Sequence, residues 1–169
     1  METSIPREKG FVLIVTCMVL AIVLGLAGLA IDAGRMYVVR SELQAFTDSA
    51  SLSAALELDG TLAGLRKARE AAAVIARGEH SMRWDLGSKS IDDFKLSFAK
   101  GVAAPDDQSW QDAPRDGNGY RFAKVMTSVP VPLTFLRALP GIQSDSSKVA
   151  AASVAGIFED SANRARLIE

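Results

Sequence analysis

The residues from Phe11 to Ile31 read FVLIVTCMVLAIVLGLAGLAI and contain no charged side chain. At about 1.5 Å of rise per residue, a helix of this length spans about 30 Å, the thickness of the hydrocarbon core of a bilayer. A buried helix of a soluble protein seldom runs so far without one charge. The run therefore predicts a transmembrane helix at residues 11–31, preceded by a short cytoplasmic tail or leader at residues 1–10.

A cleaved secretory signal is the main alternative for this run. The apolar part of a signal is shorter, about 7–15 residues, and ends at two small residues separated by one position. The segment from Ala27 to Ala30 resembles such a site, but the apolar run is too long for a signal. We therefore expect a retained anchor. Lysine and arginine are nearly balanced on the two sides of the run, so they do not fix its orientation.

Charge and composition exclude several classes of function. The 169 residues carry 19 lysines and arginines against 20 aspartates and glutamates, which gives no case for a nucleic-acid partner. His80 is the only histidine, so a catalytic triad or zinc site based on histidine has almost no material. Cys17 is the only cysteine and cannot form an intramolecular disulfide. We expect no enzyme, no catalytic residues, no cofactor and no bound metal.

Residues 32–60 are expected to continue the helix beyond the membrane. The segment from Arg35 to Asp59 contains no proline, and apolar side chains recur in it every three or four residues, which is typical of one buried helix face. This apolar stripe consists of Val39, Leu43, Phe46, Ala50, Ala54 and Leu58. The helix is expected to stop at Asp59-Gly60, where glycine can take the left-handed conformation. A helix half apolar and half amphipathic has the form of a pilin spine.

The sequence pattern of residues 61–158 predicts a small α+β head with an antiparallel sheet. A charged tail at residues 159–169 is expected to follow it. The second helix is Ala-rich and the first two strands alternate apolar and polar residues, whereas the Ala content of the last strand leaves a helix open. Pro130 and Pro132 are expected to end the second strand, and a short helix closed by Pro140-Gly141 should follow. The expected order is helix 10–59, helix 64–77, strand 93–100, strand 120–129, short helix 133–139 and strand 148–158.

The stretch GLAIDAGRMYVVRSELQAFTDSASLSAA, from Gly28 to Ala55, resembles the N-terminal signature of the TadE/TadG-like pilus-assembly family. In that signature an apolar span runs into Gly-Leu-Ala-φ-Asp-x-Gly-Arg-φ-Tyr, then into Leu-Gln and an Ala-rich segment. The matching positions are Gly28, Leu29, Ala30, Asp32, Gly34, Arg35, Tyr37, Leu43, Gln44, Asp48, Ala50, Leu52 and Ala55. The resemblance implies a single-pass protein of the bacterial inner membrane with a periplasmic head, whose partners are the bilayer and other pilus-assembly or pilin-like proteins. Homo-oligomerisation stays open.

Two positions depart from what the resemblance would lead us to expect. Thr47 stands where alanine is usual before the aspartate. Lys9-Gly10-Phe11 resembles a prepilin-peptidase site, cut after Gly10 so that Phe11 leads the mature chain. Val15 would then be the fifth mature residue, where shaft-forming pilins carry glutamate. The resemblance therefore implies an accessory, minor pseudopilin-type component of a Tad-type pilus or secretion system. The alternatives are a filament-forming subunit and a membrane-anchored ligand-binding or sensor module.

Three groups of residues allow more than one interpretation. Asp32 is either a carboxylate at the lipid–water boundary that pairs with Arg35, or a contact for a partner helix. Small residues at three- to four-residue spacing would let a second helix approach the span: Ala21, Gly25, Gly28, Ala30 and Gly34. Four carboxylates share the loop at 101–119, where turn chemistry explains them better than calcium does: Asp106, Asp107, Asp112 and Asp116.

Overall fold

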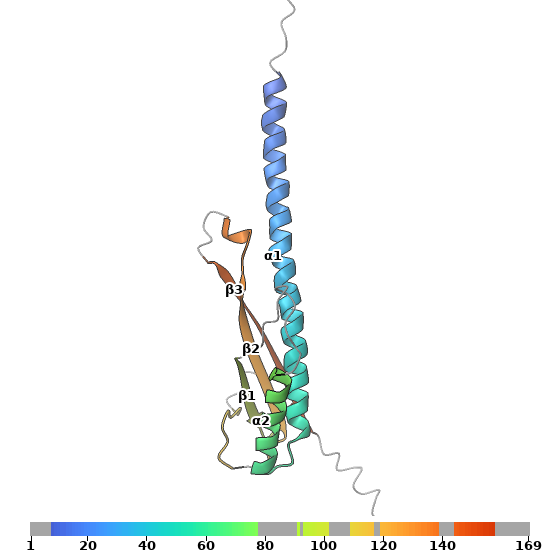
Figure 1. The fold of residues 1–169 in the computed structure, drawn as a ribbon, viewed down its shortest axis with the longest axis vertical. Helices are drawn as coiled ribbons and strands as arrows, with labels where there is room; N and C mark the ends of the chain where they lie inside the picture. The colour runs from blue at the N-terminus through green and yellow to red at the C-terminus, as the bar shows by residue number, and fades with distance from the viewer. Residues whose placement is uncertain are drawn as a thin grey trace, which may run out of the picture. The chain divides into compact units, whose positions relative to one another are not determined.

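The computed structural model describes residues 8–77, 91, 93–101, 109–116, 119–138 and 144–157. Within these residues, two α-helices precede three strands, and a short 3₁₀ turn lies between the last two strands (Figure 1). The elements are α1 Glu8–Leu56, α2 Leu62–Arg77, β1 Phe94–Ala99, β2 Phe122–Pro132, η1 Leu136–Ala138 and β3 Ser146–Gly156. The predicted α+β class, with a long apolar N-terminal helix and a small antiparallel sheet, is confirmed.

The chain divides into two compact units. The first comprises Met1–Tyr37 and Pro130–Ser147, and the second comprises Val38–Val129 and Lys148–Glu169. Helix α1 and strands β2 and β3 each contribute to both units. Several sequence-based expectations fall outside the described residues: the tail at 1–7, His80, Asp106, Asp107, Pro140, Gly141 and the tail at 159–169.

Helix α1 is continuous through the apolar run and ends at Leu56, three residues before the predicted stop. The chain then tightens, because the N–H groups of Glu57 and Leu58 donate to carbonyls only three residues back. Gly60 has a φ of +81° as expected, but it lies in the connection between the two helices, after the end of α1 at Leu56 and before the start of α2 at Leu62. The Thr61 hydroxyl accepts the Gly64 N–H at 3.1 Å, which caps α2.

The apolar part of α1 is long and apolar enough to cross a membrane, judged by length and composition. Its side chains pack against almost nothing in the described part of the chain. Phe11, for example, is 71% exposed. A large exposed apolar surface is unfavourable in water, whereas lipid tails provide an apolar surrounding for every side of the helix. The structure therefore favours a membrane as the surrounding of this part of α1.

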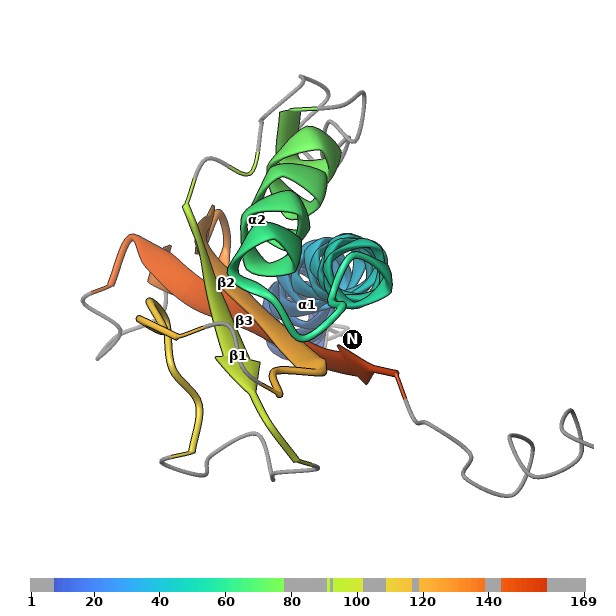
Figure 2. The same ribbon diagram turned by 90° about the horizontal axis from the view of Figure 1, so that it is seen from below.

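The second unit has its core between the helices and one face of the sheet. Figure 2 shows α2 and the C-terminal part of α1 on the same face of the strands. The predicted apolar stripe of α1 is buried in full, which confirms it. The ring of Phe46 meets the ring of Phe94 edge-on, with centroids 5.7 Å apart. From α2 and β2, Leu65, Ala68, Ala72, Ala123 and Val125 complete this core.

The sheet has the strand order β1-β2-β3. β1 pairs with β2 from Phe94 opposite Thr127 to Ala99 opposite Phe122. The predicted end of the second strand at residue 129 is wrong, because β2 continues through both prolines to Pro132. The Leu133 N–H donates to the O atom of Asp145, the residue just before β3. Backbone directions alternate along a strand, so the two proline nitrogens face the opposite edge, where the pairing with β1 has already ended.

The last predicted element is a strand, and the helical option for it is wrong. In β3, Val149, Ala151 and Ser153 are buried, whereas Ala150 and the other alternate residues are exposed. This alternation is the period-two pattern of a sheet with one covered face. The predicted short helix is reduced to the 3₁₀ turn η1 within the described residues.

Candidate functional site

Asp32 lies in the first unit, where its carboxylate is 1% exposed. Its two oxygens accept three consecutive backbone N–H groups: that of Thr134 at 3.1 Å, that of Phe135 at 2.8 Å and that of Leu136 at 2.7 Å. These N–H groups stand at the start of η1, where a helical turn leaves its donors without partners of its own. Hydrogen bonds from N–H groups to a carboxylate are among the stronger ones in proteins. Asp32 therefore fixes the connection between β2 and β3 to α1.

Two neighbouring motif residues contact the same connection. Arg35 Nη1 donates to the Thr134 hydroxyl at 3.0 Å. Gly28 lies against the Phe135 side chain, and a Cβ added at Gly28 would stand only 2.7 Å from Phe135 Cβ and Cγ. A side chain at position 28 would thus push Phe135 away. We call residues 133–137 the tip. The tip therefore contacts three motif residues on successive turns of α1: Gly28, Asp32 and Arg35.

A second polar group lies in the second unit, between α1 and β3. Gln44 Nε2 donates to Asp48 Oδ1 and to Ser153 Oγ, each at 2.9 Å. The Ser153 hydroxyl donates to Asp48 Oδ1, and the buried Thr47 hydroxyl is 2.8 Å from Ser153 Oγ. Gln44 and Asp48 of the motif therefore share one partner on the inner face of β3. Thr47, the departure from the signature, supplies a hydroxyl to this group that alanine would lack.

The remaining motif residues fall into two classes. Leu43 and Ala50 are fully buried in the core of the second unit. Tyr37 is 77% exposed and Leu52 is 56% exposed, although both are large and apolar for the most part. At Gly34, no atom of the described residues lies within 4 Å of an added Cβ. One part of the motif therefore builds the fold, and another part stays on its surface.

Residues 10–57 match a model of the Tad family, described as "Putative Flp pilus-assembly TadE/G-like". This segment is Tad-like. The matched range coincides with α1, so the resemblance seen in the sequence is confirmed over this helix. Comparison with curated proteins gives no match, and comparison with solved structures gives none.

The sequence alone did not reveal what the Tad-like helix contacts. The partners of Asp32 are 102 to 104 positions further along the chain, and they are backbone groups, which carry no side-chain signature. Ser153 had a weak signal, because it is a polar residue on the inner face of a strand made of alanine and valine. Buried polar groups of this kind usually have a hydrogen-bond partner, but the sequence does not say which.

The two carboxylates of the loop before β2 that the structure describes, Asp112 and Asp116, have lysine partners. Asp112 lies 2.8 Å from Lys95 Nζ and accepts the Ser97 hydroxyl at 2.6 Å. These hydrogen bonds from Lys95 and Ser97, together with the lysine charge, outweigh burial and lower the pKa of Asp112. Asp116 lies 3.6 Å from Lys100 Nζ. Within the described residues, no group of three His, Cys, Asp or Glu side chains is placed to hold a metal ion.

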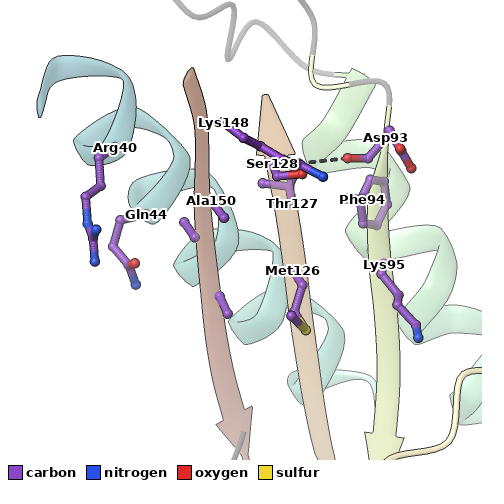
Figure 3. A pocket seen from close by; sticks show the side chains of 12 residues that line it. Arg40, Gln44, Asp93, Phe94, Lys95, Met126, Thr127, Ser128, Lys148 and Ala150 are labelled. Atoms are coloured by element: carbon purple, nitrogen blue, oxygen red, sulfur yellow. Dashed lines mark hydrogen bonds between the residues drawn. The ribbon is translucent and has the colours of Figure 1, made fainter. Parts of the chain in front are cut away.

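An open hollow of about 620 Å³ lies in the second unit (Figure 3). Its apolar lining comes from Phe94, Met126 and the alanines of β3, and its cationic lining comes from Arg40, Lys95 and Lys148. All three cations are exposed to solvent. Sites for small ligands usually enclose most of the ligand around a few buried polar groups. The hollow therefore has the character of an open surface more than of an enclosed ligand site.

Proposed function

We propose that this protein is a pilin-like accessory component of a Tad-type pilus assembly or secretion system. Residues 11–31 anchor it in the bacterial inner membrane, the head lies in the periplasm, and the protein acts by contact with other proteins of the assembly. The observation that carries this proposal is the match of the Tad family to α1, the long helix that contains both the apolar run and the motif. The family description names Flp pilus assembly, which indicates the system in which the protein works. Because the match lies on α1, we expect this helix to contact the other components of the assembly.

Exposed motif residues support contact with other proteins. Tyr37 and Leu52 belong to the signature, yet neither is buried by the chain's own packing. Near each of them on α1 lies another exposed large apolar residue, Val38 and Leu56 respectively. Exposed apolar groups that the fold itself does not use commonly mark an interaction surface, and tyrosine is enriched at the centres of such surfaces.

Site-specific photo-crosslinking in the native host tests the proposal. A photoreactive amino acid at Tyr37 or Leu52 should give adducts with pilus-assembly or pilin-like proteins, identified by mass spectrometry. The same amino acid at Arg66 or Glu70, which are exposed on α2, is the matched control and should give few adducts. Adducts with other copies of this chain alone would favour the filament-forming alternative. An equal yield of adducts at all four positions would contradict a specific role for the exposed motif residues Tyr37 and Leu52.

A further inference from the structure

The tip lies beside the last turn of the apolar run. Gly28 is three residues before Ile31, the end of the run, and Phe135 packs against it. Three residues of helix correspond to about 4.5 Å along the axis. Phe135 therefore lies at the level of side chains that the proposed span places in lipid, and its own side chain is 46% exposed.

The backbone of the tip has the hydrogen bonds that such a position demands. In a bilayer, an N–H group without a hydrogen-bond partner is strongly unfavourable, so non-helical backbone is tolerated there only when its polar groups are satisfied. The N–H groups of Thr134, Phe135 and Leu136 all donate to Asp32. The Leu133 N–H donates to Asp145 O at 2.9 Å. Four consecutive donors are thus satisfied without water.

The polar side chains around the tip fit a place at the membrane surface. Arg35 holds the Thr134 hydroxyl, and the exposed Arg137 side chain lies 3.8 Å from Asp145. Long arginine side chains can bury their apolar stems while the guanidinium groups stay in water or among headgroups. Phenylalanine is one of the apolar side chains with which surface segments enter the boundary between headgroups and acyl chains, and Phe135 is the aromatic residue of the tip.

We propose that the tip is a second membrane contact, with Phe135 in the boundary between headgroups and acyl chains beside α1. This inference rests on the part of the proposed function that makes α1 a membrane anchor. Lipid is the occupant because Phe135 is continuous with the exposed surface of the apolar run through Gly28. In this arrangement Asp32 has a defined task, which is to satisfy the tip backbone where water is scarce.

Fluorescent labelling of single cysteines in the full chain, reconstituted in phosphatidylcholine vesicles, tests the inference. Native Cys17, exposed within the apolar run, carries the environment-sensitive probe NBD as the lipid reference. Ser41→Cys in a Cys17→Ser background is the water reference, because Ser41 is exposed and lies ten residues beyond the run on the same helix. Phe135→Cys in that background reports on the tip. Spin-labelled lipids quench probes in the bilayer, and iodide quenches probes in water.

We expect the probe at position 135 to be quenched by lipids labelled near the headgroup and to be protected from iodide. Adding Asp32→Ala should remove this protection at position 135, whereas the same change in the native-Cys17 protein should leave the Cys17 probe in lipid. A probe at 135 that behaves like the one at 41, with Cys17 still in lipid, would overturn the tip proposal and leave the anchor intact. A Cys17 probe open to iodide would overturn the anchor and the tip together.

Discussion

Asp32 stands at the position where the sequence changes from apolar to polar, and its surroundings explain why a carboxylate is useful there. A carboxylate has two oxygens with four lone-pair directions, so it can accept several N–H groups at once. Here it accepts three from residues far along the chain. Arg35 adds a positive charge one turn away on the same helix. The role of Asp32 in the described chain is therefore to join segments of this protein, whatever further contact it makes with a partner.

Removing the Asp32 carboxylate should loosen the tip. Asp32→Ala leaves three backbone donors without their acceptor, and hydrogen bonds to charged groups contribute about 1.5–3 kcal/mol each, less where water replaces them. Hydrogen exchange of the amides of Thr134, Phe135 and Leu136 should therefore become faster. Asp32→Asn, which keeps one oxygen, should have a smaller effect, and Ser41→Ala on an exposed part of α1 should have none. Unchanged exchange in Asp32→Ala would show that the tip is held by other contacts.

Phe46 should be the most sensitive position of the second-unit core. Its side chain is 2% exposed and meets the Phe94 ring edge-on. Truncation of a buried phenylalanine to alanine costs about 3–5 kcal/mol, a large part of the total stability of a small domain. Phe46→Ala should therefore make the full chain in detergent more sensitive to limited proteolysis. Arg40→Ala, at an exposed position, is the control, and equal digestion of both variants would contradict this importance.

At the scale of elements, much of the architecture was predictable from periodicity. The stripe from Val39 to Leu58 repeats with the period of a helix, and all of it is buried. β3 was ambiguous because alanine favours a helix, whereas the alternation of buried and exposed residues in it is that of a strand. β2 continues through Pro130 and Pro132 because its pairing with β1 ends at Thr127, and the end of a pairing strand distant in sequence is not written in the local residues. Local sequence determined the elements, but contacts between distant segments determined their limits.

The segment at 109–116 runs beside β1, which is the outer strand of the sheet next to β2. Trp110 lies under Lys124, with the ammonium 4.7 Å from the ring centroid. Gln111 exchanges backbone hydrogen bonds with Phe98 at 2.8 Å in both directions. Asp112 adds the bonds to Lys95 and Ser97. These contacts explain why Lys124, a charged residue in a central strand, is tolerated at a buried position.

Asp112 should make the contacts of the 109–116 segment sensitive to acid. Its pKa is lower in the folded chain than the value of about 3.9 expected when unfolded. Its contribution to stability is therefore fully present above about pH 4 and is lost as the pH falls through the folded pKa. The difference in stability between the parent and Asp112→Asn should shrink in that acidic range. The effect should be small, because Asp112 is about half exposed and exposed ion pairs contribute little.

Denaturant unfolding at several pH values measures this difference. Asp116→Asn is the matched control, because Asp116 lies on the same segment and its contact with Lys100 is longer, at 3.6 Å. It should change stability less than Asp112→Asn at neutral pH. A parent-minus-variant difference for Asp112 that stays constant down to the lowest pH would contradict the role assigned to its ionised form.

At the scale of the whole molecule, Val15 bears on whether the protein polymerises. Shaft-forming pilins carry glutamate at the position that Val15 would occupy after cleavage behind Gly10, and Val15 is an exposed apolar residue of α1. A chain without that carboxylate lacks the group that would neutralise the terminal amine of a neighbour in a filament. We therefore expect no long homopolymer. Sheared surface fibres examined by electron microscopy and mass spectrometry check this, and fibres composed mainly of this chain would contradict it.

Retention of the apolar run determines whether the molecule is an anchored protein at all. A charged residue at the centre of a membrane helix costs about 2.5–3.5 kcal/mol of insertion free energy. Val19 and Ile22 are exposed and lie near the middle of the run. The double variant Val19→Lys, Ile22→Lys should therefore shift the protein from the carbonate-resistant membrane fraction to the soluble one. Ser41→Lys, which adds the same charge outside the run, should leave the protein in the membrane.

Mass spectrometry of the N-terminus of the parent protein distinguishes a retained anchor from a removed signal. A leader cut after Gly10 would leave Phe11 as the first residue and would keep the entire run, so either that mass or the uncut mass is expected from the membrane fraction. Removal as a signal would instead produce a soluble chain that begins near Asp32. That chain would lack Gly28, and Phe135 would lose the surface against which it packs. Recovery of such a soluble form as the main product would contradict the proposed membrane anchor. The mature protein would then lack the N-terminal part of the segment that the family model matches, which begins at residue 10.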